Sequence, residues 1–389
     1  MSKLAFLGAA NVAVQVAMHL LTGAELLKFA RCSKDLRRIA DSPFAWRHSL
    51  VAIRVSDPTE LPAIPRSGML RHAGFGVCLT GERMGYHNND RVRPSPQQIA
   101  ALIVWAQTVN LRELSARHEW QLTADQWKAL LKEPAMGKLV SLSLNCALAQ
   151  LSGFIDEPLL LQIAALPVIR SFGTVCTQWY AGLWRLLPVM DKMTALDLTA
   201  VTEEQDVLAH VTACVGLRSL RLSQSHYEKT GSCYRVFFTA AASQSLRNLT
   251  VLRIDYLFAG DGGVGFRGRR PCDLREYTRF FASVPQLHSL FLYRGWALEA
   301  ILPAMIRAKG LRLLRIDLHS LQWMGHAPLK FLTAKPLITL LRSAPNLGCT
   351  LKIDAPLRPH YSGMLRIPEL DRRIILEDYP LPKHSWRWY

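Results

Sequence analysis

The sequence predicts an α/β solenoid of short repeats behind a small helical module, and three observations lead to this prediction. A length of 389 residues exceeds one ordinary core but suits a small module joined to an extended repeat array. Half of the residues are hydrophobic and 20% are charged, which is a globular composition. One apolar phrase recurs beyond residue 100, each time after a helical segment. We expect parallel strands on the concave face and helices outside.

The first apolar run, residues 4–21, carries no formal charge, as the apolar part of a secretory signal does. Asn11, Gln15 and His19 interrupt it, and it continues directly into a helical pattern. A membrane span needs about twenty residues that are more uniformly apolar than this run. The run therefore favours a packed N-terminal helix over a cleaved signal or a membrane anchor.

The next stretch reads as two or three short helices held together by a tryptophan. Leu26, Leu27 and Phe29 are spaced for one helix face, and Leu36 lies on a second helix. A Ser-Pro pair then breaks the chain before Trp46. The front of the chain is thus predicted to be a compact all-α module.

Behind this module, apolar residues occupy positions one, four and six of a recurring block. The clear copies begin at Leu111, Leu139, Met193, Leu217, Leu249, Leu287 and Leu311, and weaker copies begin at Ile169 and Leu347. The intervals from 193 to 217 and from 287 to 311 are both 24 residues, and other intervals are longer. Residues 111–353 therefore resemble the leucine-rich repeat family, whose period is about 20 to 29 residues. Each block should end in a short parallel strand, with its first leucine packed on the core.

Residues that cap helices precede the apolar runs between these blocks. They are Ser95, Thr123 with Gln126, Thr202 with Gln205, and Asp273, whose helix should stop before Pro285. The alternative is an ordinary α/β domain, but its strands would be longer apolar runs without a fixed pattern.

These patterns divide the chain into four segments. Residues 1–52 form the helical module, 53–93 a linker leading into the solenoid, 94–359 the solenoid, and 360–389 a C-terminal cap or tail. The tail mixes aromatic and basic residues, which suits stacking on nucleic acid or contact with a membrane surface. Capping of the last repeat is the favoured interpretation, because solenoids need a closed end.

The front module resembles the second half of an F-box. The resemblance rests on Leu21, Glu25-Leu26-Leu27, Cys32-Ser33-Lys34, Leu36-Arg37-Arg38 and the sequence Asp-Ser-Pro-Phe-Ala-Trp that ends at Trp46. An F-box packs against a Skp-type adaptor and tethers its protein to a cullin-based ubiquitin ligase. Joined to leucine-rich repeats, it makes a class of substrate receptor. The resemblance implies adaptor contacts through Leu21, Leu26, Leu27, Phe29, Leu36 and Trp46.

The start of the module departs from the family. The family opens with Leu-Pro-x-Glu-Leu-Leu, whereas residues 9–14 here read AANVAV. Those positions carry much of the adaptor contact in the family. The resemblance therefore leaves open a degenerate module that only packs on the repeats.

The charge of the chain indicates an acidic partner. Forty-seven Lys and Arg against thirty Asp and Glu give a net charge of +17. Residues 260–389 hold 20 basic and 10 acidic residues, so +10 of this charge lies in the last third. Long-range attraction to an acidic protein, nucleic acid or an anionic membrane follows from such a balance.

Side chains in the predicted strands alternate, so the residues between the buried leucines must face outward. We expect a substrate-binding surface at Arg221, Arg253, Phe291, Arg315 and Lys352, which should form one row across the strands, and at Tyr293 in the next row. Guanidinium groups would bind an acidic or phosphorylated protein segment there. In the alternative interpretation, Asp255, Asp317 and Asp354 on the same face neutralise the row.

Nothing in the sequence predicts a catalytic residue, a metal site or a cofactor. Residues 263–268 match the GxGxxG pattern, but four residues separate its last glycine from the next helix start, so we interpret this segment as a basic insertion. The eight cysteines are scattered singly, which suits reduced thiols in a cytoplasmic or nuclear protein.

The sequence thus predicts a non-catalytic adaptor that recruits a bound protein substrate to a Skp-cullin ubiquitin ligase. The alternative is a repeat scaffold that binds RNA or another acidic partner through its basic last third. A protein partner is favoured over nucleic acid, and no membrane association is expected.

Overall fold

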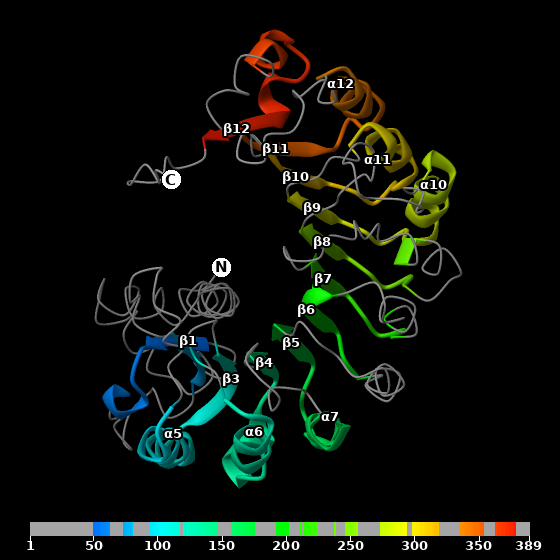
Figure 1. Ribbon diagram of the computed structural model, residues 1–389. Coiled ribbons are helices and arrows are strands. Elements are labelled where there is room, and N and C mark those ends of the chain that lie inside the picture. Colours follow the sequence, from blue (N-terminus) through cyan, green and yellow to red (C-terminus); the bar gives the residue numbers. More distant parts are fainter. Residues whose placement is uncertain are drawn as a thin grey trace, which may run out of the picture. The chain divides into compact units, whose positions relative to one another are not determined.

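The computed structural model describes residues 50–62, 73–80, 94–116, 120, 122–145, 157–175, 192–201, 211, 214–224, 237–238, 246–255, 273–293, 298–318, 334–353 and 362–378. The chain divides into two compact units, Met1–Cys176 and Thr177–Tyr389. In each unit the described strands are parallel and follow one another in the sheet in sequence order (Figure 1). The predicted α/β fold with parallel strands is confirmed.

The first unit holds five described strands. They are β1 (Leu50–Val55), β2 (Gly74–Leu79), β3 (Asn110–Ala116), β4 (Ser141–Asn145) and β5 (Ser171–Val175). Its helical elements are η1 (Pro58–Glu60), α5 (Pro96–Thr108), α6 (Ala124–Leu131), η3 (Pro134–Lys138) and α7 (Glu157–Ala165).

The second unit holds seven described strands. They are β6 (Ala195–Val201), β7 (Ser219–Gln224), β8 (Val251–Asp255), β9 (Ser289–Tyr293), β10 (Leu313–Leu318), β11 (Gly348–Ile353) and β12 (Ile374–Asp378). Its helical elements are α10 (Leu274–Ser283), α11 (Leu298–Ala304), η5 (Met305–Arg307), α12 (Ala334–Ser343), η8 (Gly363–Arg366) and η9 (Asp371–Arg373).

The recurring leucines build equivalent turns, and each of the nine predicted blocks contains a strand. The first leucine of a block donates its N–H to the carbonyl oxygen three residues earlier, as Leu217 does to Cys214, and the same bond forms at Leu249, Leu287, Leu311 and Leu347. These leucines are at most 4% exposed. A repeated bond at a repeated buried position means that the blocks are structural repeats.

Helix starts follow the predicted caps. Ser95, Thr123 and Asp273 each accept a hydrogen bond from the backbone N–H three residues later. The side-chain oxygens of Gln98, Gln126 and Glu276 accept a hydrogen bond from the backbone N–H of the capping residue, which completes three capping boxes. Helix α10 ends at Ser283, two residues before Pro285, as predicted.

Helices α10, α11 and α12 lie side by side on one side of the strands of the second unit (Figure 1). Tyr277 and Phe280 of α10 face the strands and are at most 3% exposed. Phe280 packs against Phe237 and Phe238, with ring centroids 5.5 and 4.9 Å apart. This aromatic cluster fixes the helix layer to the core on that side of the sheet.

Three strands lie outside the leucine blocks. Strands β1 and β2 lie mainly in the segment predicted as a linker, and β12 lies in the predicted cap. Two indoles tie this segment to the first unit, because Trp105 donates to the carbonyl of Pro62 at 2.9 Å and Trp120 to that of Ser56 at 3.0 Å. Residues 50–62 are therefore part of the folded unit.

Residues 1–49 of the predicted helical module lie outside the described residues. The predicted cap Thr202 with Gln205, residues 263–268 and Asp354 lie outside them as well. No described helix combines the length and apolar character that a bilayer crossing requires.

Candidate protein-binding surface

The candidate surface is the face of the second unit's sheet that α10, α11 and α12 do not cover. Leu220 and Leu222 of β7 are fully buried, and Arg221 between them has a side chain that is 36% exposed. The same alternation holds in β8, where Leu252 and Ile254 are buried and Arg253 lies between them. Outward positions predicted from the leucine pattern are confirmed for both arginines.

The register of the strands sets four of the predicted residues in line. Arg221, Arg253, Phe291 and Arg315 are direct neighbours on β7, β8, β9 and β10, and we call them the arginine row. Asp197 of β6 extends the row beyond Arg221. Tyr293 pairs with Asp255 and Asp317, one row further along the strands.

Lys352 does not belong to the arginine row. The residue that pairs with Arg315 is Thr350, and Lys352 pairs with Asp317. The cause is Cys349, which is 2% exposed and fills the buried position that Leu314 holds on β10. Side chains alternate with period two, so a buried Cys349 places Thr350 in the row. The prediction for Lys352 was therefore wrong in register.

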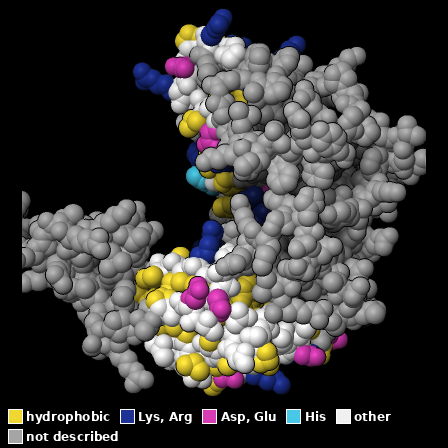
Figure 2. Space-filling view, turned by 60° about the vertical axis from the view of Figure 1, so that its left-hand side comes forward, with side chains coloured by type: hydrophobic (Ala, Val, Ile, Leu, Met, Phe, Trp, Pro, Cys, Tyr) yellow, Lys and Arg dark blue, Asp and Glu magenta, His cyan; other side chains and the backbone are white. Residues whose placement is uncertain are grey.

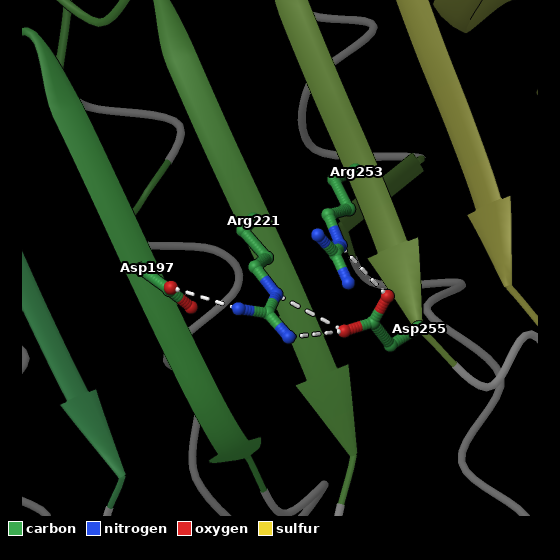
Figure 3. A network of polar contacts seen from close by, with 4 residues as sticks. All are labelled: Asp197, Arg221, Arg253 and Asp255. Carbon is green, nitrogen blue, oxygen red and sulfur yellow. Dashed lines mark hydrogen bonds and ion pairs between the residues drawn. The ribbon is translucent and has the colours of Figure 1, made fainter. Parts of the chain in front are cut away.

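One aspartate holds two members of the row (Figure 3). Asp255 Oδ2 accepts hydrogen bonds from Arg221 Nε at 3.0 Å and from Arg221 Nη2 at 2.8 Å. Asp255 Oδ1 accepts from Arg253 Nε at 3.1 Å. The Asp255 side chain is only 7% exposed, compared with 36% for Arg221 and 35% for Arg253.

A second carboxylate contacts the row from β6. Asp197 Oδ2 accepts from Arg221 Nη1 at 3.2 Å, and its side chain is 44% exposed. Partial burial by itself lowers the pKa of Arg221, but the charges of Asp197 and Asp255 outweigh this effect and raise its pKa. Arg221 is therefore held firmly as a cation.

Arg315 binds a carboxylate that the sequence patterns did not single out. Its Nη2 donates to Glu377 Oε2 at 2.9 Å, and both side chains are partly exposed. Glu377 lies on β12, which has no leucine block and was predicted only as part of a cap. The apolar residues Ile374 and Leu376 beside it are the one signal that could have marked the strand.

Among the strand residues that the structure describes, the outward face is balanced in charge. Arg221, Arg253, Arg315 and Lys352 supply four positive charges, and Asp197, Asp255, Asp317 and Glu377 supply four negative ones. Figure 2 likewise shows basic, acidic and hydrophobic side chains intermingled among the described residues of the face it displays. Neutralisation by aspartates, the alternative interpretation, is confirmed for Arg221 and Arg253.

One member of the arginine row is aromatic rather than charged. Phe291 is half-buried and stands directly between Arg253 and Arg315 on the neighbouring strands. Adjacent strands are about 4.8 Å apart, so Phe291 separates the two arginines by two strand spacings. A partner would meet an apolar contact between two cationic ones.

Two buried thiols, those of Cys214 and Cys349, are poor nucleophiles. Burial raises the pKa of Cys214 to about 11 and that of Cys349 to about 12, so both are protonated near neutral pH. Within the described ranges, no three His, Cys, Asp or Glu side chains are grouped so as to hold a metal ion.

The predicted adaptor contacts lie outside the described residues; they are Leu21, Leu26, Leu27, Phe29, Leu36 and Trp46. No model of a known protein family matches the chain, and no curated protein matches it.

Proposed function

We propose that this protein is a non-catalytic adaptor that holds a protein partner on the arginine row. The F-box-like residues 1–52 would bind a Skp-type adaptor and so bring the partner to a cullin-based ubiquitin ligase. The proposal combines the resemblance of the front module with the repeat architecture behind it.

The observation that carries this proposal is the arginine row on the face that the helices leave uncovered. The guanidinium groups of Arg221 and Arg253 are anchored on Asp255, while about a third of each of these two side chains stays exposed. Arginines held in this way lose little freedom when they bind a partner. Phe291 adds the kind of aromatic contact that is enriched at protein interfaces.

RNA binding is less well supported by this face. A phosphate backbone binds through uncompensated cations, and affinity then falls steeply with salt. Arg221, Arg253 and Arg315 each bind a carboxylate of the protein itself. A balanced, partly aromatic surface suits a protein better than a polyanion.

The adaptor function is tested by removing the front module from purified protein. The deletion should stop at residue 48, because β1 begins at Leu50 and pairs with β2 along its whole length. We expect the full chain to co-purify with a Skp-type adaptor and the shortened chain to lose it.

A second variant tests the predicted adaptor contacts without removing the front module. In the full chain, Leu26→Asp with Leu27→Asp should abolish co-purification, because both are predicted contacts. Val104→Asp is the matched control, since Val104 of α5 is 62% exposed and tolerates a charge. If the unmodified full chain does not retain the adaptor, the ubiquitin-ligase proposal is wrong.

A further inference from the structure

Two arginines share one carboxylate at the centre of the row. Arg221 and Arg253 stand directly opposite each other on neighbouring parallel strands, where like charges repel. Asp255 relieves this repulsion by accepting three hydrogen bonds from the two side chains. The two positive charges and one negative charge leave the trio with a charge of +1.

Asp197 supplies the charge that completes the balance, and its hydrogen bond with Arg221 is the longest of the four in this network. It approaches Arg221 at 3.2 Å, compared with 2.8 Å for the nearest approach of Asp255. Its side chain is 44% exposed, whereas that of Asp255 is 7% exposed. Water screens an exposed ion pair and leaves little net attraction. Asp197 is therefore the carboxylate that another anion can replace.

We propose that Arg221 binds one carboxylate or phosphate group of the partner protein through Nη1, and that Asp197 occupies this position until the partner arrives (Figure 3). The incoming group takes the place of Asp197 at Arg221 Nη1, while Asp255 keeps its bonds and holds both guanidinium groups in position. Planar guanidinium groups suit such oxyanions. The inference rests on the proposed function and adds the chemistry of recognition and an internal competitor.

The placement of the flanking carboxylates favours a protein segment over a nucleic acid. Asp197 lies at the β6 end of the face and Glu377 at the β12 end, and their side chains are 44% and 41% exposed. A polymer with one phosphate per nucleotide would meet these carboxylates as it crossed the strands. A single acidic side chain would enter between them.

Binding of labelled probes to the full chain tests this inference. The probes are a fluorescein-labelled hexaglutamate peptide, a matched peptide with phosphoserine in place of glutamate, and a ten-nucleotide uridine RNA. We expect Asp197→Asn to tighten binding of at least one peptide by about two- to five-fold, because it removes a weak competing ion pair. Arg221→Gln should weaken the same binding. Fluorescence anisotropy at low salt gives each dissociation constant, and the tighter of the two peptides distinguishes carboxylate from phosphate.

The matched control is Asp125→Asn, which removes the same charge from an exposed aspartate of α6 in the first unit. Asp125 also makes an ion pair, with Lys128 at 2.7 Å. Equal tightening by both variants would mean a general charge effect and would overturn the inference. Tightening of RNA binding alone would assign the site to nucleic acid and would overturn it as well.

The two proposals fail in different ways. If capture of the natural partner requires Arg253 and Arg315 but Asp197→Asn leaves peptide affinity unchanged, the inference falls and the proposed function stands. If capture does not require these arginines, the proposed function falls with it.

Discussion

At the scale of single residues, the charges on the strand face decide what the surface can bind. The alternation of side chains predicted Arg221, Arg253 and Asp255 on one face, and their hydrogen bonds confirm this. It could not predict which carboxylate pairs with which arginine, because cross-strand contacts depend on register. A single buried cysteine at position 349 shifted Lys352 out of the row. The sequence pattern predicts which face of the sheet a side chain lies on, whereas the pairing of the strands determines which side chains are its neighbours.

The two aspartates of the network should differ in their contribution to stability. Asp255→Asn removes a buried charge that binds two arginines, so we expect the free energy of unfolding to fall by about 1 to 3 kcal/mol. Asp197→Asn removes an exposed ion pair and should cost less than about 1 kcal/mol. Urea unfolding of each variant measures the difference. Equal losses would contradict the view that Asp255 anchors the network and Asp197 does not.

At the scale of helices and strands, the leucine blocks and the helix caps were sufficient to predict most of the described strands of the second unit. Strands β6 to β11 each lie in a predicted block, and Asp273 caps α10 as expected. Strands β2 and β12 were not predicted, because neither has apolar residues at positions one, four and six. Strand β1 does have this spacing, with Leu50, Ile53 and Val55, but it lies before residue 100, where the recurring blocks begin. Strand β2 instead reads GFGVCL, with glycines at two positions. Its pairing with β1 and β3, rather than its own pattern, makes it a strand.

Helix α10 should depend on its aromatic contacts with the core. Phe280 is fully buried and its ring packs against Phe237, Phe238 and Phe281. Phe280→Ala should therefore lower the free energy of unfolding by about 3 to 5 kcal/mol, through lost contacts and the cavity left behind. Leu274→Ala on the same helix is the control, because Leu274 is 48% exposed and its loss should cost less than about 0.5 kcal/mol. A small effect of Phe280→Ala in thermal or urea unfolding would show that the helix layer is held by other contacts.

At the scale of the whole molecule, repetition explains both the fold and the proposed mode of action. Each repeat adds one strand to the sheet and one outward position to the face, so neighbouring repeats build a surface that none has alone. The buried cysteines Cys214 and Cys349 have raised pKa values and serve packing rather than chemistry. In the proposed function, the protein would hold a partner on the face of its second unit and an adaptor at its front module.

The most direct test of this account is capture of the natural partner by three forms of the full chain, measured by quantitative mass spectrometry of co-purified proteins. Arg253→Glu with Arg315→Glu reverses two charges of the arginine row. Arg275→Glu with Arg279→Glu makes the same charge change on the exposed side of α10. We predict that one set of proteins is retained by the unmodified chain and by the α10 variant but lost from the row variant, with unchanged circular dichroism. Retention of the same proteins by all three forms would contradict the account.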